Sequence, residues 1–215
     1  MIDFPDSNPY PPIEAAPPDR TRHASNVRRK TETLALDARV KEIYVGSERE
    51  GPMRSVLTAE AVTGKGLRGD RYALGTGSYS RSKGIRDVTL IEIESLWKFF
   101  RTSGIDLHPS LTRRNIVTEG IELSELIDTP FSIGSVSFLG LRSCPPCQHL
   151  AKMIGIKDIL PGLAHSGGIY AQVLSDGFFS VDDPLMRQSE SKTTPNKPRH
   201  GRACSPPCAR RSAQN

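Results

Sequence analysis

Apolar and polar residues alternate along several short segments of the chain, and this alternation is the pattern of β-strands that bury one face. The segments that follow it, or that are short and β-branched, are 38–46, 87–91, 131–141, 169–174 and 178–181. The last two flank Ser175-Asp176-Gly177, and an Asp-Gly pair between two apolar runs predicts a β-hairpin.

One segment follows the helical period instead. Ile93, Leu96, Trp97 and Phe100 have the i, i+3, i+4, i+7 spacing, and Gly104 follows them as a C-terminal stop. A second helix is expected to begin after Cys147. Strands outnumber helices and do not alternate regularly with them. We therefore predict a mainly β (α+β) fold with a mixed or antiparallel, barrel-like sheet and a few short helices.

Proline and charge divide the 215 residues into a folded unit and two polar ends. Residues 1–37 lack a sustained apolar period, and residues 187–215 carry seven Lys/Arg against one Glu, so both ends are predicted to be disordered. Residues 38–186 between them can bury one core. The net charge of +5 belongs to the basic tail and the predicted domain is nearly neutral, which argues against a nucleic-acid partner.

The predicted cellular location rests on two features that the sequence lacks, a membrane-spanning segment and a targeting signal. No run approaches the roughly 18 apolar residues of a membrane-spanning helix. The acidic, proline-rich start does not have the composition of a secretory signal or of a mitochondrial presequence. A cytoplasmic protein is predicted.

The four cysteines form two pairs, Cys144/Cys147 and Cys204/Cys208. The first pair lies between a predicted strand and a predicted helix, where backbone N–H groups and the helix dipole stabilise a thiolate. Metal or cofactor ligation, thiol–disulfide exchange, structural zinc and no role at all are four alternatives, and His149 is a possible third ligand. The long separation of the two pairs disfavours a four-cysteine zinc site.

Three further segments carry groups suited to ligand binding. Arg113 and Arg114, followed by Asn115, can bind a phosphate or carboxylate, although an exposed charged turn is the commoner explanation of such a segment taken alone. The glycine-rich loop 64–71 reads G-x-G-x-x-G, but no helix or βαβ unit follows it, so it does not predict a nucleotide site. His165 precedes two glycines that permit close approach of a ligand, and it fits a structural role as well. The charged residues of the glycine-rich loop are Lys65, Arg68, Asp70 and Arg71.

In this order, the segments resemble the MOSC domain, the module named for the C-terminus of molybdenum cofactor sulfurase. The resemblance spans roughly residues 55–186 and looks like the short, stand-alone bacterial-type members. Its most specific parts are RRNIVTEGI (113–121) and CPPCQHL (144–150). One departure is Tyr72, where many relatives have a histidine.

The resemblance implies a molybdenum cofactor (molybdopterin) whose metal is bound by the Cys147 thiolate. Cys144 is not uniform in the family, so its role is less defined. The implied activity is reduction of N-hydroxylated compounds with electrons from an external reductase. The resemblance implies that the cofactor's phosphate is bound by positively charged side chains, namely Arg113 and Arg114, with Lys65, Arg68 and Arg71 as further candidates. Asn115 and Asp70 complete the expected cofactor-binding set.

Proton donation is expected from His149, His165 or Asp70. The alternative function is a sulfur carrier or thiol-redox protein that uses Cys144 and Cys147 without a metal. Pyridoxal phosphate binding is a further property that the resemblance allows at the level of the family.

Overall fold

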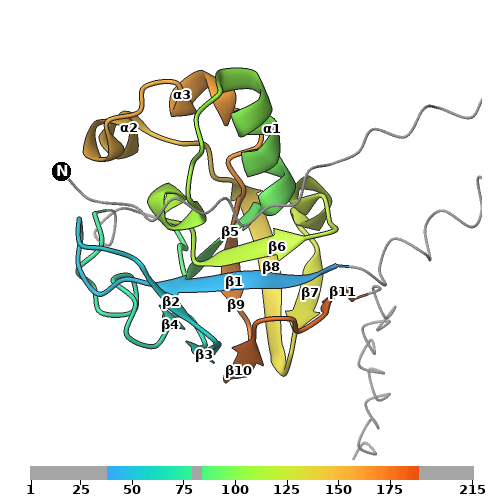
Figure 1. Ribbon diagram of the computed structural model, residues 1–215. Helices are drawn as coiled ribbons and strands as arrows, with labels where there is room; N and C mark the ends of the chain where they lie inside the picture. Colours follow the sequence, from blue (N-terminus) through green and yellow to red (C-terminus); the bar gives the residue numbers. More distant parts are fainter. Residues whose placement is uncertain (1–37, 79–83, 189–215) are drawn as a thin grey trace, which may run out of the picture.

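Eleven strands and a few short helices make up the part of the chain that the computed structural model describes, residues 38–78 and 84–188 (Figure 1). The strands are β1 (Arg39–Val45), β2 (Arg54–Val56), β3 (Thr58–Val62), β4 (Gly66–Leu67), β5 (Val88–Glu92), β6 (Ile116–Glu119), β7 (Pro130–Ile133), β8 (Val136–Ser143), β9 (Ile169–Val173), β10 (Gly177–Ser180) and β11 (Leu185–Arg187). The helices are α1 (Ile93–Ser103), α2 (Gln148–Ile154) and α3 (Ile159–Gly162), with the short 3-10 helices η2 (Pro109–Thr112) and η3 (Leu123–Leu126).

The two predicted disordered ends lie almost wholly outside the described residues, and so do Cys204 and Cys208. Arg187, which the charge pattern assigned to the tail, is the last residue of β11. Within residues 38–78 and 84–188, no helix is both long enough and apolar enough to cross a membrane.

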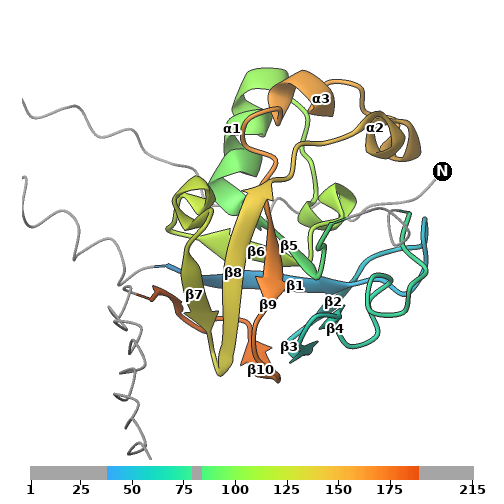
Figure 2. The same cartoon turned by 180° about the vertical axis from the view of Figure 1, so that it is seen from behind.

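Eight strands form one strongly curled sheet in the order β11-β7-β8-β9-β5-β6-β1-β2 (Figures 1 and 2). All neighbours pair antiparallel except β5 and β6, which are parallel. The start of β1 also pairs with the segment before β11, because Val40 donates to the Asp183 carbonyl (3.0 Å) and Leu185 donates to the Ala38 carbonyl (2.8 Å). This seam closes the sheet into a barrel. The predicted mainly β, barrel-like fold is therefore confirmed.

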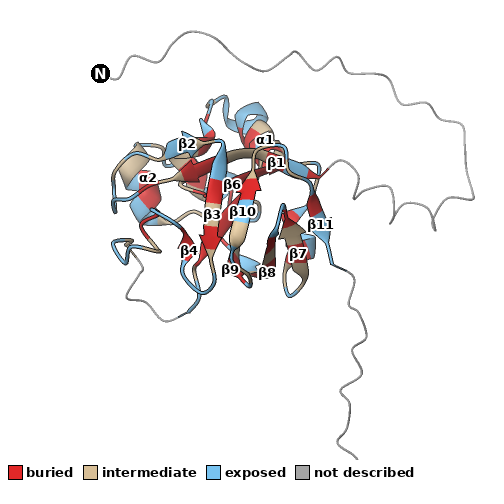
Figure 3. Ribbon diagram, turned by 90° about the horizontal axis from the view of Figure 1, so that it is seen from below, coloured by how far each residue is buried: buried red, intermediate tan, exposed pale blue. Residues whose placement is uncertain are grey.

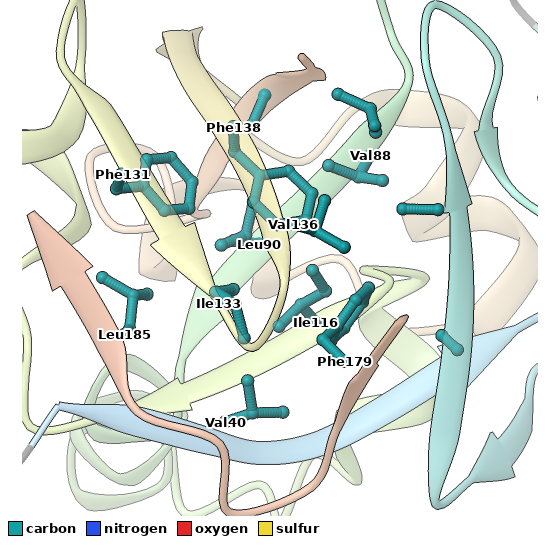
Figure 4. Packing of buried hydrophobic residues seen from close by; sticks show 14 of the residues in the cluster. Val40, Val88, Leu90, Ile116, Phe131, Ile133, Val136, Phe138, Phe179 and Leu185 are labelled. Carbon is teal, nitrogen blue, oxygen red and sulfur yellow. The ribbon is translucent and has the colours of Figure 1, made fainter. Parts of the chain in front are cut away.

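A second sheet, β10-β3-β4, packs against the barrel and shares its core. Buried and less buried positions alternate along β3 (Figure 3), as expected for a strand with one face on the core. The barrel interior is filled by aromatic and branched side chains. Figure 4 shows among them Val40, Leu90, Ile116, Phe131, Ile133, Phe138 and Phe179.

The helices gather at one end of the barrel and cover the outer face of its central strands (Figures 1 and 2). Ile91 and Val117 point to this face, whereas their neighbours Leu90 and Ile116 point inward. The predicted helix is confirmed as α1, and Gly104 ends it in a left-handed conformation with φ 71°. Its buried residues are Ile93, Ser95, Leu96 and Phe99, while Phe100 is 49% exposed, so the buried face is rotated from the predicted one.

The single strand predicted over 131–141 is wrong, because the segment is the hairpin β7–β8. Gly134, with φ 55°, and Ser135 form its two-residue turn. Ile133 and Val136 are register partners, so the apolar residues of both strands face the same core. The turn shifts the alternation by one position, because the partners Ile133 and Val136 are three residues apart, and this break in the pattern marks the hairpin.

The hairpin predicted around Ser175-Asp176-Gly177 is also wrong. β9 pairs with β8 and β5, whereas β10 pairs with β3 in the other sheet. The Asp176 carboxylate accepts hydrogen bonds from the backbone N–H and the hydroxyl of Thr63, both at 2.7 Å. These bonds fix a corner where the chain passes from one sheet to the other.

Candidate functional site

A pocket of about 160 Å³ brings Cys144 and Cys147 together with six arginines from distant parts of the chain. It lies where the end of β8, the start of α2 and strand β9 meet the loops that precede β5 and β6. The arginines are Arg49, Arg71, Arg86, Arg113, Arg114 and Arg142, and the other polar side chains on the wall include Tyr72, Thr89, Thr112, His149 and Tyr170.

The two cysteines occupy different environments. Cys144 is buried, its N–H donates to the Gly168 carbonyl (2.8 Å), and its own carbonyl accepts from Arg114. Cys147 is only partly buried, and it is the N-cap residue of α2, which begins at Gln148 as predicted. Cys147 therefore presents the more accessible sulfur to the pocket.

Tyr170 links the cysteines to the cationic wall. Burial, together with its hydrogen-bonded neighbour Cys144, raises the pKa of Tyr170 to about 12, so this phenol stays protonated at physiological pH. Tyr170 is the register partner of Arg142 across the β8–β9 pair, and the guanidinium carbon of Arg142 lies 4.1 Å from the ring centroid. This distance corresponds to a cation–π contact.

Arg114 is 8% exposed and acts as a clamp between three segments. It donates to the carbonyls of Gly167 (2.9 Å), Thr112 (3.2 Å) and Cys144 (2.5 Å). Three of its five N–H groups are thus used for protein contacts. Arg114 fixes the positions of the cysteine segment and of the glycine loop 167–168.

Arg113 has a left-handed backbone, with φ 59°, and its guanidinium enters the loop 48–51. It donates to the carbonyls of Gly51 (2.5 Å), Glu48 (3.1 Å) and Arg49 (3.1 Å). Burial and the nearby charge of Arg71 lower the pKa of Arg113 from its usual value. Arg113 holds this loop in place at the pocket.

Asp70 and Asn115 lie beneath the pocket wall, and both are fully buried. The Asp70 carboxylate accepts from Arg71 (3.0 Å) and from the Asn115 amide (3.0 Å). Arg71 donates in turn to the Arg113 carbonyl (3.0 Å). Neither Asp70 nor Asn115 lines the pocket, and their contacts orient the arginines that do.

The remaining predicted site residues divide into one that lines the pocket and three that do not. His149 lines it and lies 3.4 Å from the Glu50 carboxylate. His165 lines a separate hollow of about 420 Å³ that contains Glu92, Glu94 and Lys98. Arg68 is exposed and ion-paired with Glu60 (2.5 Å), and Lys65 is exposed near the same β3–β4 edge.

The pocket also contains charged and aromatic residues that the sequence did not single out, among them Arg49, Arg86, Arg142 and Tyr170. Arg142 lies two positions before Cys144, and Arg86 lies two positions before β5. Their closeness in sequence to the cysteine motif and to a predicted strand is the only feature that could have indicated a place in the pocket. Tyr170 occupies an ordinary alternating position of β9.

The pocket combines a soft sulfur ligand with several positive charges, and it therefore suits a ligand that is anionic and thiophilic. Among the described residues, no three or more His, Cys, Asp and Glu side chains lie close enough to hold a metal ion by themselves. A metal bound at Cys147 would need most of its ligands from another molecule. A pterin cofactor that carries its own metal and a phosphate fits this set of donors.

Comparison with known proteins identifies the type of domain. The family model of the MOSC domain matches residues 82–186. No curated protein sequence matches the chain. Strands β1 to β4 precede the matched segment, although β1 and β2 belong to the same eight-stranded sheet.

Several solved structures share the fold. The YuaD protein from Bacillus subtilis superposes with a TM-score of 0.59 at 15% identity, covering 69% of this chain and 93% of that one. YiiM from Escherichia coli gives a TM-score of 0.53 at 21% identity, covering 70% of each chain. YiiM from Geobacillus stearothermophilus gives 0.54 at 14% identity, covering 73% of this chain and 77% of that one.

Proposed function

We propose that this protein, which carries a MOSC domain, holds a molybdenum cofactor through Cys147 and reduces N-hydroxylated compounds in the cytoplasm. The observation that carries the proposal is the partly buried Cys147 in a pocket lined by six arginines. A thiolate is a soft ligand suited to a sulfur-bound metal such as molybdenum. Guanidinium groups suit the phosphate of the cofactor's pterin.

The inner arginines are the residues that would hold the phosphate. Arg114 keeps two N–H groups beyond those that bind backbone carbonyls, and Arg113 and Arg71 lie beside it. Asp70 and Asn115 would contribute by fixing Arg71 and the 113–115 segment. Cys144 and Tyr170 would orient the segment that carries Cys147.

The reaction converts R–NH–OH, two electrons and two protons into R–NH₂ and water, so the N–O bond breaks and an N–H bond forms. When bound, the cofactor supplies the two-electron and oxygen-accepting chemistry. The electrons come from a separate reductase protein. His149 is the histidine that lines the pocket, and it would donate a proton to the departing oxygen, with Glu50 supporting its ring.

Molybdenum content tests this proposal directly. The wild-type protein, Cys147→Ala and the control Cys144→Ala are purified from a host that makes the cofactor, and metal is measured by elemental analysis. Cys147→Ala is expected to lose molybdenum and activity on a hydroxylaminopurine while its cofactor-free melting temperature is retained. Cys144→Ala is expected to keep metal. A Cys147→Ala protein that retains molybdenum and activity would contradict the assignment.

A second function, sulfur transfer or thiol-redox chemistry without a metal, is favoured by the presence of both thiols in one pocket. The Tyr170 hydroxyl beside Cys144 can donate a hydrogen bond to sulfur. Mass spectrometry of the native protein separates the two functions. A persulfide adds about 32 Da to a cysteine peptide, and its presence in a protein without molybdenum would favour the carrier.

A further inference from the structure

Arg142 differs from the inner arginines in how its side chain is used. Arg71, Arg113 and Arg114 all donate hydrogen bonds to protein oxygens. Within residues 38–78 and 84–188, by contrast, the Arg142 guanidinium makes no hydrogen bond or carboxylate ion pair, and it lies against the Tyr170 ring. Arg142 is exposed and lines the pocket, so its N–H groups are available to a ligand.

The Tyr170 ring also fixes where this guanidinium lies. The two residues are register partners in the β8–β9 ladder, next to a register shift between Gly140 and Arg142, and the guanidinium carbon is 4.1 Å from the ring centroid. An arginine held in this way loses little side-chain entropy when it binds a ligand. Arg142 is therefore a preorganised donor at the mouth of the pocket.

Arg49 provides a second available guanidinium at the exposed rim. Its Nε–H donates to the Ser78 hydroxyl (3.2 Å), and this is its one hydrogen bond among the described residues. Its terminal N–H groups carry no protein partner there. Arg113 holds the loop that bears Arg49 through three carbonyl contacts, so the backbone of Arg49 is held in place.

The charges of the pocket are strongly unbalanced. Six arginines line it, whereas no carboxylate among the described residues does; Asp70 is ion-paired with Arg71, and Glu50 is paired with His149. The inner arginines suffice for the phosphate of a cofactor. Arg49 and Arg142 leave a further positive charge at the rim, where a second anionic group would be stabilised.

We infer that the substrates of this pocket carry an acidic group, a phosphate or a carboxylate, and that Arg142 and Arg49 bind it. The reaction assigned to these substrates rests on the proposed function, whereas the recognition of an anion at the rim does not. Planar guanidinium groups bind either acid through paired hydrogen bonds. The acidic group would anchor the substrate at the rim, with its N-hydroxyl group directed toward Cys147.

Matched substrate pairs test this specificity with the cofactor-loaded protein and dithionite-reduced methyl viologen as electron donor. One pair is the ribonucleotide and the ribonucleoside of N-hydroxylated adenine, and the other is benzamidoxime with and without a ring carboxylate. The acidic member of at least one pair is expected to have a kcat/KM about tenfold higher or more. The pair that shows the gain identifies the acidic group.

Variants assign the preference to Arg142. Arg142→Ala is expected to remove the advantage of the acidic substrate while the neutral substrate is still reduced, and Arg142→Lys is expected to restore part of it. Arg101→Ala, an exposed arginine of α1 outside the pocket, is the charge control and should leave the preference intact. Equal kcat/KM values for both members of both pairs would overturn the inference and leave the proposed function standing.

Measurements of ligand binding without turnover distinguish a failure of the proposed reductase function from a failure of the proposed anion site. If no N-hydroxylated compound is reduced, the proposed function is wrong, and the anion site is then tested by calorimetric titration of the purified protein with adenosine monophosphate and with benzoate. Binding of either that weakens about tenfold or more in Arg142→Ala, but not in Arg101→Ala, supports the site. Absence of binding, or equal binding by all variants, overturns it.

Discussion

Replacement of Arg114 by methionine is expected to destabilise the cofactor-free protein by about 3–5 kcal/mol. Methionine fills a similar volume but cannot donate to the carbonyls of Gly167, Thr112 and Cys144. Each buried carbonyl that loses its hydrogen-bond donor costs about 1–3 kcal/mol of stability. The substitution also removes a buried positive charge, and this gain offsets part of the loss from the three carbonyls. Such a loss is a large fraction of the roughly 5–15 kcal/mol that stabilises a typical domain.

Urea unfolding of the cofactor-free protein measures this loss. Arg114→Lys keeps the charge and can reach one carbonyl, so it should fall between the wild type and Arg114→Met. Arg68→Met, which removes an exposed ion pair with Glu60, should leave the free energy of unfolding almost unchanged because solvent screens such a pair. If Arg114→Met is no less stable than Arg68→Met, the clamp contributes nothing to folding and the reasoning fails.

Two further predictions concern stability. Gly168→Ala should cost more than about 3 kcal/mol, because φ is +89° and a Cβ would lie 1.8 Å from the Leu90 carbonyl oxygen. Gly155→Ala is the control, because Gly155 also has a positive φ (+73°) but no heavy atom lies within 4 Å of the added Cβ, so it measures the cost of the backbone conformation alone. Equal melting temperatures of the two variants would refute the steric argument. Burial raises the pKa of Asp87 despite a hydrogen bond from the Val173 N–H. Its ionised form therefore destabilises the folded state, so stability falls as the pH rises through the unfolded pKa toward the folded one. Asp87→Asn should have a higher melting temperature than the wild type at pH 7 and lose that advantage near pH 3. A difference in melting temperature that does not depend on pH would exclude ionisation of Asp87 as its cause.

Elements whose evidence is local could be predicted from the sequence. The strand at 38–46 and the helix that ends before Gly104 depend on neighbouring residues, and both are present as β1 and α1. The partners of a strand depend on residues far away in the chain, which is why the local pattern predicts a hairpin for β10 although this strand pairs with β3. The buried face of α1 likewise depends on what packs against it, and Phe99 replaces Phe100 there.

The candidate site shows the same division. Cys144, Cys147 and Arg114 stand in recognisable segments, and the structure brings them together in one pocket. Arg142 and Tyr170 come together only through the register of β8 and β9, which no local pattern specifies. Arg68 lies in an equally recognisable segment but points to an exposed edge of the other sheet, so a cationic residue near a motif is not by itself evidence of a site.

The seam between Ala38–Val40 and Asp182–Leu185 has a consequence for how the chain folds during synthesis. The hydrogen bonds that close the barrel join the first described strand to the segment before the last one. While the chain grows from the ribosome, β1 therefore waits for its final neighbour until almost the whole domain has emerged. Contacts of such high sequence separation form slowly. The edge of β1 remains open through most of translation, and this is the stage at which a chaperone would protect it.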